Sequence, residues 1–492
     1  MSVPRTISNV CSSRHFAHCL GKKRTFGNSP ALWVGVIWLL YISSATTARI
    51  DEEVRQEGVG RTPCLAYENS TFSLACGFNW TYYYNEKDYI LLKANEIFDG
   101  NDYGIDLNGL PPNSWDGLFK IDPSVEWSDA PIIKRLHMIN GETSSRGGFL
   151  VQSYQNNFTV DSCSSSGRIG VEGTGREGGA GGICGHQCSG SIIIKDCWTT
   201  GAIRGLNAGG IAGSHFGSDG GRTIITNCWS EGGISGSNSG GISGFRLGAN
   251  SGDVIISKSY SIGDMTGTNS GGICSGNAAV HNGHARISEC YTLGKISGPN
   301  NGGITSWETG SNFGHVEITN CYTTGEITGT DSGGICGIET GRSNGVILIR
   351  NVYTLGEVGH SGAGSIIGHV NSEAREVKIT MSVYNVGPMI GYDKGKIAIS
   401  SRNSFDLNDI SGKVYCYKDC PSFCWDTSTV WKASLPRGYP SLKNQVSTFP
   451  IIPAPSPTKK TTSKGHHRMI VLPVQCRQWP KLGASHLRRA KQ

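Results

Sequence analysis

Residues 320–337, NCYTTGEITGTDSGGICG, contain the pattern that decides the fold. Cys321 and Tyr322 follow a run of alternating apolar residues, Gly325 interrupts the chain, and a glycine-rich run closes the segment at 333–337. Short strand-like pieces between glycine turns, without helical periodicity, are typical of β-structure.

The same pattern recurs every 31 residues along the chain. The second residues of the successive units are Cys197, Cys228, Ser259, Cys290, Cys321, Val352 and Val383. A fixed period of this length is the signature of a solenoid. We therefore predict an all-β parallel β-helix (β-solenoid) of about nine coils with one repeat per coil, preceded by irregular N-terminal capping coils.

Equivalent residues of successive coils should form ladders. The expected aromatic ladder consists of Trp198, Trp229, Tyr260, Tyr291, Tyr322, Tyr353 and Tyr384. Its rings should stack from coil to coil, and the alternative is an exposed stripe that binds sugar rings. A second ladder should form hydrogen bonds along the axis and contains Asn207, Asn238, Asn269, Asn300 and Asp331.

The cysteines divide into two groups. Those of the repeats share their position with serine and valine, so we expect small buried core residues. Cys64 and Cys76 flank a possible glycosylation site and are expected to pair. Cys416, Cys420 and Cys424 are further disulfide candidates, because a fourth zinc ligand is not evident near them.

Composition supports this organisation. Glycine makes up 70 of the 492 residues, charged residues reach only 17%, and the formal charge is +6. The repeats carry no basic stripe, so we expect no nucleic-acid partner. We divide the chain into residues 1–49 (signal peptide or signal anchor), 50–95 (small glycosylated region with cysteines), 96–410 (β-helix), 411–446 (C-terminal cap with Cys and Trp) and 447–492 (disordered basic tail).

The N-terminus resembles a secretory signal. Basic residues precede the apolar run 31–42, and small residues follow up to Ala48. The segment is either cleaved there or kept as a single-pass signal anchor, which is the only membrane contact that we expect. Three acceptor triplets, at Asn69, Asn79 and Asn157, agree with a secreted or cell-surface glycoprotein.

At the repeats the chain resembles proteins with the GLUG motif, on the evidence of Cys321-Tyr322-Thr323-Thr324-Gly325 and Gly333-Gly334-Ile335-Cys336-Gly337. The match covers about residues 163–391, with isoleucine where leucine is usual. Residues 97–166 are similar to the opening of pectin-lyase-like right-handed β-helices. The resemblance implies a right-handed solenoid in an extracellular surface protein, an adhesin or, less often, a polysaccharide-active enzyme.

We therefore expect binding of a glycan or an extracellular protein, for adhesion or matrix contact, without catalysis. The binding surface is expected at the variable loops 214–222, 245–252, 277–284 and 307–313. The alternative is a lyase, hydrolase or epimerase acting on uronate polymers. Its candidate residues are Asp264, Lys295, Glu326 and Glu357, which follow corner glycines on successive coils. No cofactor or metal site is expected, since the histidines show no recurring ligand spacing.

Overall fold

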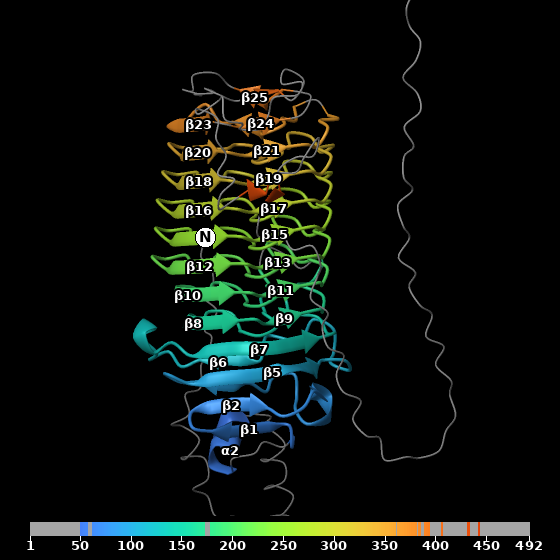
Figure 1. Cartoon of the computed structure of the whole chain (residues 1–492), viewed down its shortest axis with the longest axis vertical. Coiled ribbons are helices and arrows are strands. Elements are labelled where there is room, and N and C mark those ends of the chain that lie inside the picture. Colours follow the sequence, from blue (N-terminus) through green and yellow to red (C-terminus); the bar gives the residue numbers. More distant parts are fainter. Residues whose placement is uncertain are drawn as a thin grey trace, which may run out of the picture. The chain divides into compact units, whose positions relative to one another are not determined.

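The computed structural model describes residues 50–57, 62–172, 178–360, 362–380, 382–384, 388–393, 405–406, 431–432 and 441–442. Within these ranges the chain forms a parallel β-solenoid of about ten turns with almost no helix. Figure 1 shows the turns stacked as parallel rungs. The all-β architecture and the coil of about 31 residues are confirmed.

The first turns are irregular and begin before residue 96. Strand β2 already pairs in parallel with β5, and β4 pairs in parallel with β6. The N-terminal elements are α2 (Ile50–Glu57), β1 (Leu65–Glu68), β2 (Thr71–Leu74), β3 (Phe78–Asn79), η1 (Trp80–Tyr82), β4 (Ile90–Leu92), β5 (Ile97–Asp106), β6 (Phe119–Ile121), η2 (Trp127–Asp129), β7 (Ile132–Ile139), β8 (Asn156–Asp161) and β9 (Ser164–Ser165). The segment expected to be a small separate region thus continues the β-sheet of the solenoid.

Each regular coil contributes one long and one short strand. The long strands are β10 (Ser189–Lys195), β12 (Arg222–Thr226), β14 (Asp253–Ser257), β16 (His284–Ser288), β18 (His315–Thr319), β20 (Val346–Arg350) and β23 (Glu376–Thr380). The short strands are β11 (Trp198–Thr199), β13 (Trp229–Ser230), β15 (Tyr260–Ser261), β17 (Tyr291–Thr292), β19 (Tyr322–Thr323), β21 (Tyr353–Thr354), β24 (Val383–Tyr384) and β26 (Phe405–Asp406). The remaining strands are β22 (Ile367–Val370), β25 (Ile390–Asp393), β27 (Trp431–Lys432) and β28 (Ser441–Leu442).

The interior is filled by alternate residues of these strands. Val254 and Ile256 of β14 are fully buried, and the residue between them is only partly so. The Gly-Gly pair of each coil lies against the short strand of the next coil. A side chain at Gly241 would approach the backbone oxygen of Gly272 to 2.2 Å, so only glycine allows this spacing.

The cysteines of the repeats are buried and unpaired, as expected. Cys228 and Cys321 donate from Sγ to the backbone oxygens two residues earlier, at 3.3 and 3.2 Å. Ser259 donates from Oγ in the same way, at 2.8 Å. A thiol and a hydroxyl therefore form the same hydrogen bond to the backbone at this position. Burial also raises the pKa of Cys336, to about 12, which keeps that thiol protonated.

The last regular repeat is one residue shorter than the sequence pattern suggests. Tyr353 pairs with Val383, and Tyr384 pairs with Thr354. The predicted places of Val383 in the cysteine ladder and of Tyr384 in the aromatic ladder are therefore wrong. Ser382 takes the inner position and donates from Oγ to the oxygen of Thr380 at 3.0 Å. Cys336 pairs with Ile367 at a spacing of 31 residues, whereas Thr340 pairs with Val370 at a spacing of 30, so the later coil is one residue shorter between Ile367 and Val370.

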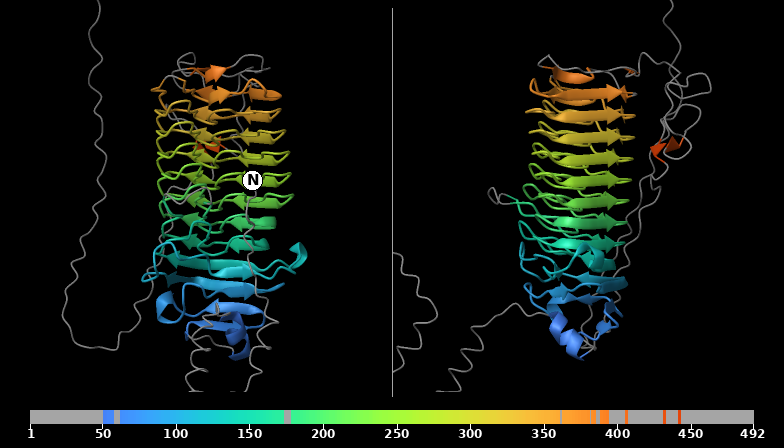
Figure 2. Two further views of the ribbon diagram at one scale, coloured as in Figure 1. Left: turned by 180° about the vertical axis from the view of Figure 1, so that it is seen from behind. Right: turned by 90° about the vertical axis from the view of Figure 1, so that its left-hand side faces the viewer.

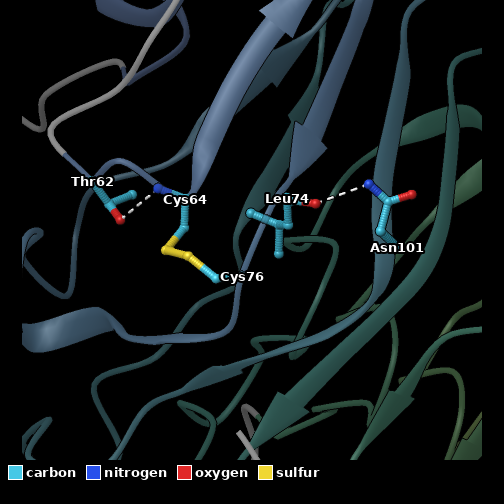
Figure 3. The surroundings of a disulfide bond; sticks show 5 residues. All are labelled: Thr62, Cys64, Leu74, Cys76 and Asn101. Carbon is cyan, nitrogen blue, oxygen red and sulfur yellow. Dashed lines mark hydrogen bonds between the residues drawn. A yellow bond between two sulfur atoms is a disulfide. The ribbon is translucent and has the colours of Figure 1, made fainter. Parts of the chain in front are cut away.

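The predicted disulfide between Cys64 and Cys76 is present, with the Cα atoms 5.0 Å apart. It joins the chain on either side of the β1–β2 hairpin, as Figure 3 shows. Nearby, the Asn101 side chain donates to the backbone oxygen of Leu74 at 2.8 Å. The disulfide therefore closes the first hairpin, and the Asn101 hydrogen bond holds that hairpin to the next turn of the solenoid.

The expected asparagine ladder is also present. Asn238, Asn269 and Asn300 each donate from Nδ2 to Oδ1 of the asparagine one coil earlier, at 3.1, 3.0 and 3.0 Å. All of them adopt the left-handed conformation, with φ of 52°, 56° and 61°. Asparagine tolerates this conformation better than other non-glycine residues, and its amide both donates and accepts.

We predict that Asn269→Ala destabilises the solenoid by about 2–4 kcal/mol, because it removes two hydrogen bonds and strains the left-handed backbone. The matched variant Asn269→Gly loses the same hydrogen bonds without the strain, so it should be more stable than the alanine variant by about 1 kcal/mol. Urea unfolding followed by circular dichroism measures both. Equal midpoints for the two variants would contradict the strain argument.

Candidate functional site

The four residues proposed for catalysis lie on successive coils, and all are exposed. Lys295 forms an ion pair with Glu326 at 2.9 Å, and its backbone N–H donates to Asp264 at 2.8 Å. Glu357 follows one coil later. The charges alternate from Asp264 through Lys295 to Glu326, and only Glu357 repeats the sign of its neighbour. Opposite charges on an open surface are the arrangement of a solvated ladder, since they limit repulsion between coils.

The same corner continues into the irregular coils, where Glu142 pairs with Arg168 through the backbone. An open cleft of about 350 Å³ lies here and is lined by Leu110, Pro111, Pro112, Asn140, Gly141, Glu142, Ser166, Gly167 and Arg168. Sequence reasoning missed this cleft because Glu142 lies outside the regular period. Its polar groups are suited to hydrogen bonding with a small polar ligand.

The aromatic ladder stacks as predicted from Trp198 to Tyr353. Neighbouring ring centroids are 4.6–5.9 Å apart and the rings are within 11° of parallel. The rings form a cluster separate from the core, while the residues on either side, such as Cys228 and Ser230, are buried in the coil. The pleat thus turns the rings outward. Because Trp229 to Tyr353 are only 2–5% exposed, they are not an open sugar-binding stripe.

The variable loops 214–222, 245–252, 277–284 and 307–313 lie along one edge of the solenoid, which we call the loop edge. This edge carries a different ladder, which the repeat pattern did not reveal. One left-handed residue recurs at each coil, with φ between 50° and 61°. Its members are Gln187, His215, Arg246, Asn277, Glu308 and Glu339. Unlike the inner ladders, this position changes its chemistry at every coil from Gln187 to Glu308, and only Glu308 and Glu339 are alike. Within a repeat protein, a conformation that is kept while the side chain varies indicates a surface that is free to acquire specificity.

A row of rings runs along this edge beside the varied ladder. Tyr154 and His186 are 5.4 Å apart, and His186 and His215 are 5.2 Å apart, between ring centroids. Phe245 follows His215 at 6.3 Å. Trp307 then lies parallel to Phe245 at 6.4 Å and 7°. Tyr154 is 52% exposed and the other rings are partly exposed, so the row is accessible from solvent.

Glycine explains how Phe245 and Trp307 meet although a whole coil separates them. Gly276 occupies the equivalent position of the intervening coil, and a side chain there would contact Trp307. Its missing side chain lets the two rings lean toward each other. Sequence reasoning placed both rings at the start of variable loops, but it did not foresee their contact.

The two histidines of the row are neutral at physiological pH. Burial, with smaller contributions from His215 and Arg146, lowers the pKa of His186 to about 4. Burial and Arg246 lower the pKa of His215 to about 4 as well. The imidazole Nδ1 of His186 lies 2.6 Å from Ser214 Oγ. The row therefore presents uncharged rings, with Arg146 and Arg246 beside them.

The other end of the loop edge is ionic. Arg342 forms an ion pair with the buried Glu308. Nδ1 of His369 lies 3.2 Å from the carboxylate of Glu339. The Asn371 amide also donates to Glu339. The edge thus changes from neutral rings in the earlier coils to paired charges in the later ones.

The glycosylation candidates differ in their surroundings. Asn69 is exposed at the turn between β1 and β2. Asn79 and Asn157 are partly buried and use Nδ2 to donate to Asn108 at 3.0 Å and Val125 at 2.9 Å. Asn69 is therefore the exposed acceptor of the three, and its Nδ2 donates only to the neighbouring Glu68 side chain, at 3.5 Å. Cys416, Cys420 and Cys424 lie outside the described residues, as do the signal segment and the basic tail.

Comparison with protein-family models, with curated proteins and with solved structures finds no match to this chain. Among the described residues, no group of three or more His, Cys, Asp or Glu is placed to hold a metal ion. No helix in the described ranges has the length and apolar character needed to cross a membrane. The function is therefore argued from the surfaces of the solenoid.

We predict that stability falls as the pH decreases from about 6.5 to about 4. The unfolded histidines bind protons below about pH 6.5, whereas His186 and His215 stay neutral in the fold until about pH 4. The double variant His186→Gln/His215→Gln should show a smaller loss of urea midpoint across this window. The variant His284→Gln, at an exposed histidine, is the control. An unchanged slope in the double variant would show that other groups dominate.

Proposed function

We propose that this chain is an extracellular or cell-surface solenoid that binds glycans through its loop edge, without catalysis. The observation that carries the proposal is the partly exposed row of rings from Tyr154 to Trp307. The aromatic ladder of the short strands is covered, whereas this row of rings is accessible from solvent. An exposed apolar row of this length is typical of a binding site, and its ligand would lie along the solenoid axis.

The chemistry of the row suits an extended carbohydrate. Aromatic rings offer flat apolar faces, on which the C–H faces of sugar rings pack. The ladder beside them includes the partly exposed Gln187 and Arg246, whose side chains can hydrogen-bond to the sugar hydroxyls. Coils lie about 4.8 Å apart, so consecutive sugar units of a linear polysaccharide contact consecutive coils. An apolar face with polar groups along one side is what a polyhydroxylated ligand requires.

The extracellular location rests on separate support. The N-terminal segment resembles a secretory signal or signal anchor, and the disulfide between Cys64 and Cys76 is typical of an oxidising compartment. The GLUG-like and pectin-lyase-like resemblance points to the same setting. The buried thiols of the repeats are compatible with it, since burial protects them from oxidants.

The alternative is an enzyme acting on uronate polymers. Its candidate carboxylates Glu326 and Glu357 lie on adjacent coils, but they lie on an open surface, and Glu326 is paired with Lys295. A general acid needs an environment that holds its proton near neutral pH. An exposed, paired ladder offers no such environment, so binding is the function that the geometry supports better.

We predict that the full chain, produced in a secretory host, binds polysaccharides on a glycan array. Phe245→Ala/Trp307→Ala should weaken binding at least about tenfold, because two stacked rings contribute roughly 1–3 kcal/mol. Phe313→Ala is the control, since Phe313 is 62% exposed on the same edge but outside the row. Equal losses in both variants would contradict a site at the row.

The same preparation tests the enzyme. Incubation with uronate polymers, followed by assays for reducing ends and unsaturated products, should show no turnover. Turnover that disappears in Glu326→Gln/Glu357→Gln would replace the binding proposal with the catalytic one. If the array shows no binding and the product assay shows no turnover, a protein partner would be favoured.

We predict that Asn69 carries a glycan when the chain passes through the secretory pathway, because its amide is exposed. Treatment with an endoglycosidase should then lower the mass of the wild type, and Asn69→Gln should remove one such step. Peptide mass spectrometry assigns the site. An unmodified Asn69 in protein recovered from the medium would count against this site.

A further inference from the structure

The outward aromatic ladder on the short strands is a second surface, distinct from the loop edge. Its rings belong to Trp198, Trp229, Tyr260, Tyr291, Tyr322 and Tyr353. Ile262 and Leu355 pack against the same cluster, and Leu293 on this side is 38% exposed. The face is therefore apolar along six coils.

Such a face is too large to remain open in water. Each aromatic side chain of this size buries about 150–250 Å² when covered. A monomer rarely exposes a contiguous apolar patch larger than a few hundred Å². The low exposure of the rings, 2–5% from Trp229 to Tyr353, shows that something covers this face.

The covering element comes from the C-terminal part of the chain. Strands β27 and β28 are antiparallel, and the backbone of Trp431 pairs with that of Leu442. Leu442 is only 1% exposed and belongs to the same cluster as the aromatic ladder. Figure 2 shows these two short strands beside one face of the stacked coils. Tyr353, the last residue of the ladder, precedes Leu442 by 89 positions in the sequence.

We propose that the aromatic ladder is a docking surface whose occupant is the chain's own pair of C-terminal strands, β27 and β28, anchored by Leu442. Leu442 packs against the rings of the same molecule and so keeps an adhesive face out of solvent. The chemistry of the contact is that of a leucine side chain on a flat stack of rings. This surface and its occupant are independent of glycan binding at the loop edge.

The state of the tyrosine hydroxyls agrees with an apolar cover. The buried Tyr260 hydroxyl has no hydrogen-bond partner among the described residues. Burial raises the pKa of Tyr260, Tyr291 and Tyr322 well above the usual value, with a smaller contribution from neighbouring phenols or Glu231. The ladder is therefore suited to apolar side chains.

Hydroxyl-radical footprinting of the full chain, analysed by mass spectrometry, tests the proposal residue by residue. Leu442→Asp places a charge against the rings and should release the two strands. Oxidation of Trp229, Tyr260 and Tyr291 should then rise by about tenfold, toward the rate of Tyr82, which is 71% exposed. The control Phe313→Asp introduces the same charge at an exposed apolar residue and should leave these rates unchanged.

Two further measurements keep the outcome decisive. Phe158 is fully buried in the coil interior, so its continued protection shows that the solenoid has kept its fold. If Leu442→Asp also exposes Phe158, the milder Leu442→Ala replaces it and should give a smaller rise confined to the ladder. Rings that stay protected in both variants overturn the proposal. Wild-type protection that weakens on dilution also overturns it, because a second copy would then be the occupant.

Discussion

Parallel pairing in register is the constraint on which the rest of this structure depends. Because Trp198 pairs with Trp229, and Trp229 with Tyr260, each residue has its own equivalents as neighbours above and below. A residue type is therefore acceptable only if it tolerates a copy of itself about 4.8 Å away. This requirement explains the residues found at each position of the coil.

The ladders satisfy that requirement by different physical means. Asparagine amides donate to one neighbour and accept from the other, so a row of them is self-complementary. Aromatic rings stack with their planes nearly parallel. Thiols and hydroxyls inside the coil bond to backbone oxygens of their own strand and do not need each other. Charged side chains are tolerated where signs alternate, as in Lys295 and Glu326.

The outer surfaces follow from the same constraint. A repeated ring on the short strands produces an apolar face along the whole array, and such a face needs a cover that the coils themselves do not supply. The loop edge lies beyond the paired strands, so its residues are not restricted to self-compatible types. Gly276 and Trp307 differ from their equivalent Phe245 for this reason. The regular faces thus provide stability, and the irregular edge is left for recognition.

The sequence by itself determined the architecture, because a strict period leaves one way to stack the strands. It also determined the buried cysteine ladder, the asparagine hydrogen bonds and the Cys64–Cys76 disulfide. Only the tertiary structure decided which way the aromatic ring faces, since Trp229 and its neighbours follow one another in a two-residue strand too short to show alternation. It also decided the register at Val383, which depends on a one-residue deletion between Ile367 and Val370. The row from Tyr154 to Trp307 and the contact of Leu442 with the ladder depend on residues outside the common period or far apart in the chain. A local pattern contains no information on such contacts, because they form only when the coils are stacked and the C-terminal strands have folded back.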